Sequence, residues 1–412
     1  MKKYLYIIPI IISLVSLQAQ SQPWPPSAPP LPLSTTNIIH ASNVNELFSA
    51  VEKAKPTQTI LLQDGTYYMP RYLEIRTDNV TLRSASGNRK AVILDGSKSN
   101  HGELVGFRSC SGVTVADITI QNIKWNGFKI NSDHNVQNLT IYNCIIHNIW
   151  QRGVKSVRVP IENREEIRPK NIRVQHCLFY NDHPKQFTND ETDTPKTFNG
   201  NYIGGIDTMY AKNWLISDNV FINIQGRTRE GRGCVFMWHH AEDCVIERNT
   251  IIDCDVGIAL GNSSGIGPKH SSVHGTNMIV RNNFITRTPE SGILADYTKD
   301  CQIINNTIFD PQNRMNRLLR IIHNNQGLLI ANNLLSGPGM SIETEDAVRF
   351  EHNLIGEFSD LFVDVKNGDL HLKNPNAKII DQGLSIPSII NDIDKQKRDQ
   401  HVDIGADEWL KN

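Results

Sequence analysis

The sequence has no excess of charge of either sign. Its 412 residues include 42 lysines and arginines against 43 aspartates and glutamates, for a formal net charge of −1. Nucleic acids and anionic membrane surfaces favour partners with a clear basic excess. The composition therefore argues against nucleic-acid binding, although a local basic patch is compatible with the same sum.

Long apolar runs are absent after the first 17 residues. A pair of lysines precedes an apolar run from Tyr4 to Leu17, and small and polar residues with a cleavage point at Ala19 follow. The run is shorter than the roughly 20 apolar residues of a membrane-spanning helix, and the pattern is typical of a secretory signal peptide. We expect residues 1–19 to be removed, and the mature protein to be periplasmic or secreted without membrane insertion.

Cysteine motifs for zinc or for a disulfide framework are also missing. The seven cysteines form no CxxC pair and no Cys/His cluster, and their number is odd. Cys144 and Cys177 occupy the same place in two successive repeats, as do Cys244 and Cys301. Residues that recur with a repeat are buried core elements more often than bridge partners. We therefore expect free, buried thiols.

What the sequence contains is an internal repeat. Each unit is an alternating strand, a short polar turn and a second apolar strand, which is the pattern of a β-solenoid. The units begin at Gly112, Asn138, Asn171, Asn213, Asp243, Asn277, Asp300, Gly327 and Ala347. This predicts an all-β fold, a single-stranded right-handed parallel β-helix of about ten coils spanning residues 38–412.

One column of the aligned repeats consists of asparagine. Its members are Asn219, Asn249, Asn283, Asn306, Asn333 and Asn353, with Cys144 and Cys177 in the same column earlier. A stacked amide can bond the amides above and below it and also satisfy the backbone of a sharp turn. We interpret the column as an internal ladder and not as a binding site.

Two segments precede the repeat. Residues 20–37 form a linker with prolines from Pro23 to Pro32, which is expected to tether or space the domain. A short amphipathic helix follows, with Asn43 and Glu46 at the spacing of a capping box. Its apolar face comprises Val44, Leu47, Phe48 and Val51. We expect this helix to cover the open end of the solenoid.

The alternating strands, the asparagine column and the N-terminal helix resemble the pectate-lyase-like superfamily of parallel β-helices, from about residue 38 to the end. The segment VDIGADEW from Val402 is similar to the closing segment of many exported bacterial β-helix proteins. The resemblance implies a carbohydrate-active enzyme. Polysaccharide lyases of this fold commonly combine a lysine or arginine base with calcium, so the resemblance also implies calcium as a candidate cofactor. The chain lacks the Asn-x-Glu…Lys…Arg run of chondroitinase B-type lyases.

A further strand of each coil, usually introduced by glycine, carries the ionisable residues. Period two along these strands places Lys129, Lys155 and Asp207 on one outward column, on successive coils about 5 Å apart. His239 and Asp296 are expected further along their strands on the same alternation. Charged residues are dense between about residues 150 and 240, and this stretch folds into three neighbouring coils. Long insertions at 160–170 and 182–200 are expected to build groove walls beside it.

This patch contains the candidate site residues. The candidates for catalysis are Lys155, His239, His240, Asp207, Tyr210 and Arg232. The candidates for substrate binding are Lys129, Arg152, Arg158, Lys212, Arg229 and Trp238. Cations neutralise a uronate carboxylate or a sulfate, and aromatic side chains lie against sugar rings, so the patch suits an anionic carbohydrate.

Two kinds of base are available for proton abstraction. Lys155 is flanked by Arg152 and Arg158, and like charges lower the pKa of a lysine. His239 or His240 could instead act as base or acid near neutral pH, with Asp207 orienting the histidine or holding a cation.

Several functions share this chemistry. The first is a carbon–oxygen lyase acting by β-elimination on a uronate-containing poly- or oligosaccharide. A sugar dehydratase and an epimerase use the same proton abstraction. A glycoside hydrolase needs two carboxyl groups about 5 to 9 Å apart, for which Asp207 could pair with Asp296, Glu230 or Glu242. The last alternative is a non-catalytic carbohydrate-binding solenoid. A monomer is expected in each case.

Overall fold

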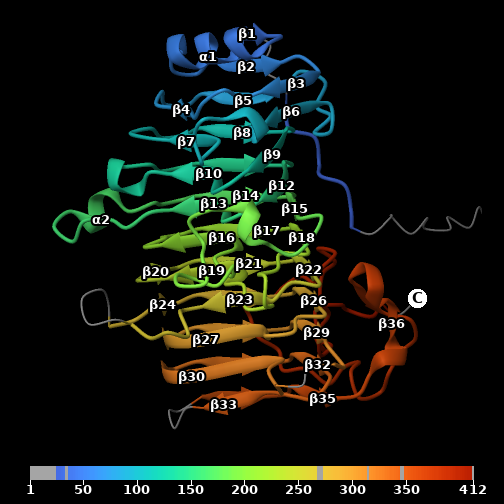
Figure 1. Cartoon of the computed structure of the whole chain (residues 1–412). Coiled ribbons are helices and arrows are strands. Elements are labelled where there is room, and N and C mark those ends of the chain that lie inside the picture. The colour runs from blue at the N-terminus through green and yellow to red at the C-terminus, as the bar shows by residue number, and fades with distance from the viewer. Residues whose placement is uncertain (1–24, 33–35, 267–271, 313–314, 344–347, 411–412) are drawn as a thin grey trace, which may run out of the picture.

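The chain is a rod of stacked coils in the computed structural model, which describes residues 25–32, 36–266, 272–312, 315–343 and 348–410 (Figure 1). Three long parallel sheets run along the rod, and each coil contributes one strand to each sheet. The predicted all-β parallel β-helix is therefore confirmed. The longest sheets hold twelve strands within the described residues, so the solenoid is slightly longer than the ten coils expected.

The strands of each sheet follow one another in chain order for most of the rod. The first sheet comprises β1 (Ile38–Ala41), β2 (Thr59–Leu62), β5 (Thr81–Ser84), β8 (Thr114–Ala116), β11 (Thr140–Tyr142), β14 (Arg173–Gln175), β17 (Leu215–Ser217), β21 (Val245–Glu247), β25 (Ile279–Arg281), β28 (Gln302–Ile304), β31 (Leu329–Ala331) and β34 (Arg349–Glu351). The second sheet comprises β3 (Gly65–Tyr68), β6 (Val92–Asp95), β9 (Thr119–Ile123), β12 (Ile145–Ile149), β15 (Leu178–Tyr180), β18 (Val220–Ile222), β22 (Thr250–Ile252), β26 (Phe284–Thr286), β29 (Thr307–Phe309), β32 (Leu334–Ser336) and β35 (Leu354–Gly356).

The third sheet carries the candidate site. It comprises β4 (Leu73–Ile75), β7 (Val105–Phe107), β10 (Asn126–Ile130), β13 (Arg152–Ser156), β16 (Gly204–Met209), β19 (Gly233–Trp238), β23 (Val256–Leu260), β27 (Ser291–Lys299), β30 (Leu319–Gln326) and β33 (Ser341–Glu343), with the short β20 (Ala241–Glu242) and β24 (Gly275–Thr276). In the part of the chain that the structure describes, two α-helices, α1 (Val44–Lys53) and α2 (Arg164–Ile167), lie outside the sheets. Short 3-10 helices occur at Gly96–Lys98, Ser132–His134, Phe187–Asn189, Ser359–Leu361 and Val365–Asn367. No described helix is both long enough and apolar enough to cross a membrane.

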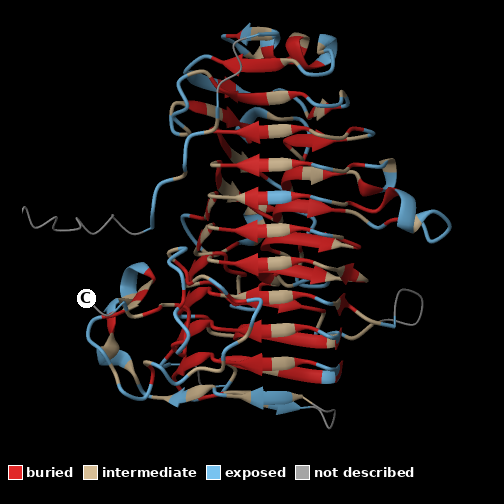
Figure 2. Cartoon of the chain, turned by 180° about the vertical axis from the view of Figure 1, so that it is seen from behind, coloured by how far each residue is buried: buried red, intermediate tan, exposed pale blue. Residues whose placement is uncertain are grey.

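Stacked aliphatic side chains fill the interior. In the third sheet Val154, Ile206, Val235, Ile258 and Ile293 are paired in register on successive strands, and all are fully buried. Strands about 4.8 Å apart bring each side chain into contact with its equivalents above and below, so apolar burial accumulates along the rod. Seen from behind, the strands are mostly buried, and exposed residues gather in the turns and at the ends (Figure 2).

The asparagine ladder is confirmed. Each side-chain amide donates to the Oδ1 of the next asparagine, at 2.8–3.0 Å, through Asn219, Asn249, Asn283, Asn306, Asn333 and Asn353. Cys177 continues the column, because its backbone N–H donates to Asn219 Oδ1 and its Sγ accepts from the Cys144 N–H. All seven cysteines are free and buried, as predicted.

The side chain of Asn43 caps the N-terminus of helix α1, which confirms one half of the predicted capping box. Asn43 Oδ1 accepts from the Glu46 N–H at 3.0 Å, but the Glu46 carboxylate accepts from Ser42 and not from Asn43. The helix residues Leu47, Phe48 and Val51 are buried. Figure 1 shows α1 lying over β1 and β2 at the end of the rod, where we expected a cap.

The proline-rich segment does more than space the domain. Residues 25–32 lie along the rod, where Tyr142 Oη donates to the Pro29 carbonyl at 2.6 Å and Arg83 donates to the Pro32 carbonyl at 3.0 Å. The proline carbonyls are unpaired in an extended chain, so they are available as acceptors for side chains of the rod. The predicted signal peptide, residues 1–19, lies outside the described residues.

The coils end at β35, before the predicted boundary at residue 412. The antiparallel pair β36 (Phe362–Asp364) and β37 (Asp369–Leu372) folds back beside the second sheet, as Figure 1 shows. Phe362 and Leu370 pack there against Phe284, Phe309 and Leu334. The VDIGADEW segment supports this arrangement through a buried ion pair, Arg398 to Glu408 at 2.8 Å.

Replacing His371 in this C-terminal segment is expected to destabilise the protein in a pH-dependent way. Burial alone lowers the pKa of His371, but Asp369 at 2.6 Å and Asp394 at 3.0 Å outweigh it and raise the pKa to about 10. His371→Gln should lower the free energy of unfolding by about 2 kcal/mol at about pH 6, because it leaves these carboxylates without their cation. The folded-state pKa is raised, so the contribution is complete below about pH 6.5 and is lost as the pH rises through 10. Denaturant midpoints at pH 6 to 10 measure the difference, and His352→Gln, an exposed histidine, is the control. An effect independent of pH would contradict this assignment.

Candidate functional site

The outward side chains of the third sheet form columns along the rod. Lys129 pairs with Lys155, and Lys155 pairs with Asp207, in the register that the sequence predicts. Towards the C-terminus the column continues through Phe236, Ala259, Leu294 and Arg320. Along the rod the column is therefore charged from Lys129 to Asp207, apolar from Phe236 to Leu294, and positively charged again at Arg320.

Asp207 is the centre of the charged part. Its carboxylate is almost fully buried and lies 2.6 Å from Arg152 Nε, 2.9 Å from Lys155 Nζ and 3.1 Å from Trp238 Nε1. Burial by itself raises the pKa of Asp207, but Lys155 and Arg152 outweigh it and lower the pKa to about 2. We call these four residues the Asp207 cluster.

Lys155 is thus placed differently from the expectation. We expected arginines to be its dominant neighbours, but its ammonium group forms an ion pair with Asp207. Arg152 also binds Asp207, with its side chain passing over Gly204 of the next strand. Arg158 lies at an exposed position beyond the strand. The nearest charged partner of Lys155 is consequently a carboxylate and not an arginine.

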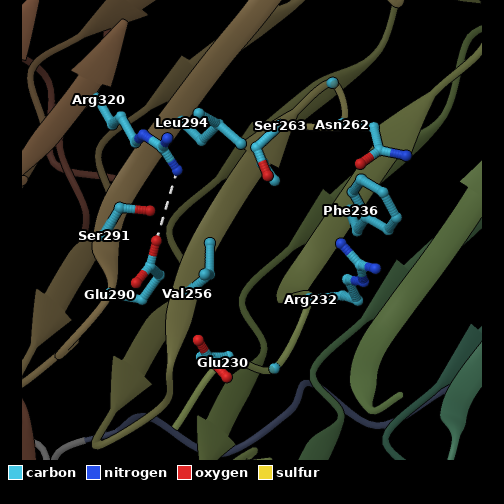
Figure 3. Close-up of a pocket in the computed structure, with 13 residues that line it drawn as sticks. Glu230, Arg232, Phe236, Val256, Asn262, Ser263, Glu290, Ser291, Leu294 and Arg320 are labelled. Carbon is cyan, nitrogen blue, oxygen red and sulfur yellow. Dashed lines mark hydrogen bonds and ion pairs between the residues drawn. The ribbon is translucent and has the colours of Figure 1, made fainter. Parts of the chain in front are cut away.

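A groove lies beside this cluster on the same face of the sheet, with a volume of about 200 Å³ (Figure 3). Its apolar floor is formed by Phe236, Val256, Ala259 and Leu294. The polar lining is Glu230, Gly231, Arg232, Gly261, Asn262, Ser263, Glu290, Ser291 and Arg320. The groove therefore combines an apolar surface with cations at both sides.

Arg232 is the unpaired cation of the groove. Its guanidinium group is half-buried, and it makes no ion pair or hydrogen bond with the residues that the structure describes. Burial, and then the charge of Arg152, lower the pKa of Arg232. A partly desolvated cation without a partner has a strong tendency to bind an anion.

The carboxylates of the groove already have partners. Glu290 lies 2.8 Å from Arg317 Nη1 and 3.4 Å from Arg320 Nη1, and Figure 3 shows the second of these contacts. Glu230 accepts from Thr228 Oγ1 at 2.6 Å and from Asn201 Nδ2 at 3.1 Å. The two glutamates come from loops that precede β19 and β27, which is why period-two patterning along the strands did not reveal Glu290.

His239 is not on the outward column. If the glycines before these strands were aligned, Gly233 would pair with Gly205. It pairs instead with Gly204, a shift of one residue, so Trp238 and not His239 lies on the outward face. His239 follows the end of β19 with a φ of 50°, is 3% exposed and stacks on Trp238 at a centroid distance of 4.1 Å.

Tyr210 and His240 do not line the groove, and the Tyr210 ring stacks on the rings of His239 and His240 at centroid distances of 6.0 and 6.3 Å. Tyr210 is fully buried beside Val159 and Ile167, with the Arg164 guanidinium over its ring at 4.3 Å. This is the environment of a packing residue, so we assign Tyr210 no contact with substrate. Burial, followed by the charges of Arg164 and Arg168, lowers the pKa of His240.

The remaining candidates for substrate binding do not gather at the groove. Lys129 pairs with Glu103 at 2.5 Å, and Lys212 pairs at 3.0 Å with Glu242 of the short strand β20, away from the residues that line the groove. Arg229 lies 3.2 Å from both Asp253 and Asp255. The structure therefore brings together Arg152, Lys155, Asp207, Trp238 and Arg232 from the predicted set.

The sequence interpretation did not identify Arg320, which lines the groove, or His323, which pairs with Asp296. Arg320 lies on the outward column of the third sheet, but the high density of charge between residues 150 and 240 placed the predicted site on earlier coils. Asp296 was considered only as a hydrolase carboxylate, and the structure pairs it with His323 at 2.7 Å.

The family resemblance implies calcium, but the described residues of the groove do not form a suitable set of calcium ligands. Within the described residues, the group that meets the geometric requirement for a metal is His371, Asp394 and Asp407, in the C-terminal segment. Both ring nitrogens of His371 already bond to carboxylates, and calcium prefers oxygen ligands. These residues do not fit calcium, and no step below uses it.

Comparisons with a family profile and with one solved structure support the fold. A family profile described as "Right handed beta helix region" matches residues 103–275. The crystal structure of pectate lyase Pel9A is similar with a TM-score of 0.60 at 12% identity, covering 91% of this chain and 97% of that chain. An alginate lyase from Paenibacillus sp. str. FPU-7 has a TM-score of 0.43 at 10% identity (77% and 99% covered). The GH136 lacto-N-biosidase from Eubacterium ramulus has a TM-score of 0.46 at 10% identity (77% and 64% covered).

The last two TM-scores lie below 0.5, and nothing about activity follows from them. A search of curated proteins found no sequence match. The identity to pectate lyase Pel9A is also low, so this likeness concerns the fold alone. The chain therefore has a right-handed parallel β-helix fold, the fold for which the structure of pectate lyase Pel9A shows a likeness.

Proposed function

We propose that the protein is a carbohydrate-active enzyme that binds a uronate-containing poly- or oligosaccharide in the groove and cleaves it by β-elimination. The observation that carries the proposal is the half-buried, unpaired guanidinium of Arg232 beside an apolar floor. In an anionic sugar, a carboxylate would pair with Arg232 while the apolar face of the ring lies on Phe236 and Leu294.

The Asp207 cluster supports the same assignment. Arg152 and Lys155 place two positive charges on one buried carboxylate, so the cluster is a net cation at the edge of the groove. A positive field lowers the energy of the dianionic state that forms when a proton leaves the carbon next to a carboxylate. Trp238, which the cluster holds by its Nε1, adds an aromatic surface next to Phe236.

Removing the Arg232 charge should weaken substrate binding. Arg232→Ala is expected to raise KM by about 10- to 100-fold, because a charge-assisted hydrogen bond contributes about 1.5–3 kcal/mol. The assay incubates the protein with polygalacturonate, alginate, glycosaminoglycans and ulvan-type substrates, and follows the ultraviolet absorbance of unsaturated uronate ends together with product mass. Arg173→Ala, at an exposed position of β14 in the first sheet, is the matched control and should behave as wild type. Equal KM values for the two variants would remove Arg232 from the binding site.

A glycoside hydrolase is the second candidate, because Glu230 and Glu290 both line the groove. Hydrolysis adds one water to the products and produces no unsaturated ends, so the same assay separates the two reactions. Loss of one water without cleavage would indicate a dehydratase, and a changed stereocentre at constant mass would indicate an epimerase. Binding of these glycans without any product would support a non-catalytic solenoid and would overturn the proposal of an enzyme.

We also propose that the protein acts outside the cytoplasm, as a monomer, after removal of residues 1–19. The apolar run from Tyr4 to Leu17 behind two lysines supports export. N-terminal sequencing of the protein from periplasmic and culture fractions tests both the cleavage point and the compartment.

A further inference from the structure

The strands β27 and β30 are irregular where they pass the end of the groove. Asp296 pairs with Ile322 and Thr298 pairs with Asn325, so Tyr297 alone opposes two residues, His323 and Asn324. This is a β-bulge, a device that re-aims side chains and occurs often beside active sites. Tyr297 has a φ of 48° and His323 a φ of 53°. Left-handed backbone is unfavourable for such bulky side chains, so the surrounding structure must hold them there.

The bulge brings His323 onto a buried carboxylate. Asp296 Oδ1 lies 2.7 Å from His323 Nδ1, and Asp296 is fully buried. The ring of Tyr297 stacks on the ring of His323 at a centroid distance of 5.0 Å. A carboxylate at Nδ1 stabilises the tautomer with the proton on Nδ1 and leaves the lone pair of Nε2 free. The His323 side chain is 43% exposed, so that lone pair is accessible.

This pair adjoins the groove. Asp296 follows Leu294 of the groove floor by two residues, on the same face of β27. Gly261, which lines the groove, has a φ of 115°, and a Cβ there would lie 2.3 Å from the Asp296 carbonyl oxygen. Arg320 precedes His323 by three residues on β30, and its charge acts on the Asp296 carboxylate. The His323 imidazole and the Asp296 carboxylate thus lie next to the groove, and the Arg320 cation lines it.

An ordinary structural ion pair would leave these features unexplained. Asp296 Oδ2 is buried and has no hydrogen-bond partner among the described residues, and Arg320 Nε makes no hydrogen bond with them, although it lies 3.7 Å from Glu343 Oε1. Buried polar atoms are almost always satisfied, and exceptions concentrate at functional sites. Burial raises the pKa of Asp296 to about 6 even though His323 opposes the shift, so the carboxylate is held at an energetic cost. The pair therefore fits a site that is completed by a ligand.

We infer that His323, positioned by Asp296, is the proton acceptor for a uronate residue bound at this end of the groove, with Arg320 facing the sugar carboxylate. The inference rests on the proposed function and names the base that the earlier candidates do not supply. His323 Nε2 takes the proton from the carbon next to the carboxylate, and the C–H electron pair moves onto the carboxylate as an enediolate. That pair then forms the carbon–carbon double bond while the β carbon–oxygen bond breaks. The leaving oxygen takes the proton back from the imidazolium, so the histidine is regenerated.

Kinetics of matched variants test the inference. His323→Gln is expected to lower kcat by about 100- to 10,000-fold with KM within about threefold of wild type, because general acid–base catalysis contributes about that much. Asp296→Asn should lower kcat by about 10- to 100-fold, since Asp296 acts through the histidine. His134→Gln, an exposed histidine beside Asp133, is the control and should match wild type. Circular dichroism and thermal melting check that each variant folds.

A spectroscopic readout separates positioning from structure. In ¹⁵N-histidine spectra of the whole protein, neutral His323 should carry its proton on Nδ1, and Asp296→Asn should change the tautomer populations. If His323→Gln keeps full kcat on a glycan that wild type cleaves, the inference is wrong and the proposed function stands. If wild type produces no unsaturated ends from any glycan of the panel, the proposed function falls and this inference falls with it. A His323 proton on Nε2 would overturn the positioning role of Asp296 in either case.

Discussion

Replacing Asp207 with asparagine is expected to lower the free energy of unfolding by about 3–5 kcal/mol. Asp207 is the single anion for Arg152 and Lys155 among its described contacts, and Arg152 is only 1% exposed. The amide keeps the shape of the side chain but removes its charge. Two buried cations then lie next to each other without compensation, and breaking a buried ion pair from one side costs about this much.

Denaturant unfolding measures the Asp207 effect against a matched variant. Glu103→Gln removes the carboxylate that pairs with Lys129 on the same outward column, where both side chains are more exposed. We expect a smaller loss there, because water can solvate the remaining cation. A loss in Asp207→Asn no larger than that in Glu103→Gln would contradict the central position of Asp207.

The Asp207 effect should also depend on pH. The folded-state pKa of about 2 is lower than the ordinary value of 3.8, because the two cations outweigh the effect of burial. The stabilisation by the charged Asp207 is therefore fully present above about pH 3.8 and is lost as the pH falls through 2. The difference between wild type and Asp207→Asn should be constant near neutral pH and should shrink in acid.

The second large loss in the free energy of unfolding is expected when one amide is removed from the middle of the asparagine ladder. Asn283 donates to Asn306 Oδ1 at 2.9 Å and to the Ile246 and Arg281 carbonyls, and its Oδ1 accepts twice from Asn249. Asn283→Ala deprives all of these fully or partly buried groups of a partner. Each unsatisfied group costs about 1–3 kcal/mol, and local relaxation recovers part of the sum, so we expect a total of about 3–5 kcal/mol.

The chain contains its own controls for the ladder. Asn353 ends the column at a half-buried position, so Asn353→Ala should cost less than Asn283→Ala. Cys177 shows that sulfur is accepted in this column, because its Sγ accepts from the N–H of the preceding member. Asn283→Cys should therefore fall between wild type and Asn283→Ala in thermal melting. Equal melting temperatures for Asn283→Ala and Asn353→Ala would contradict a continuous ladder.

The sequence predicts the features that repeat with the coil. The asparagine column and the outward column of Lys129, Lys155 and Asp207 follow from strand alternation, because coils stack in register. The partner of each charge does not follow from alternation. Lys129 binds Glu103 from the segment before β7, and Asp207 binds Arg152 and Trp238 in addition to its column neighbour Lys155.

The features missed from the sequence arise where the repeat is broken. A shift of one residue at Gly233 moves His239 off the outward face, since the side-chain period of a strand is two. A bulge aims His323 at Asp296, and bulges have no reliable signal in a single sequence. The groove joins Glu230 and Glu290 from different loops, and loop positions depend on contacts distant in the chain.

The seven buried thiols can report where along the rod neighbouring coils separate. They are distributed from Cys110 to Cys301, so they mark successive depths along the stack. Burial raises the pKa of Cys110 and Cys244 to about 12, which leaves very little thiolate for reaction while a coil is closed. The rate at which each cysteine is alkylated therefore measures how often its coil separates from its neighbours. A rod that frays from its ends would expose Cys110 before Cys244, and a rod that opens at its centre would show the opposite order.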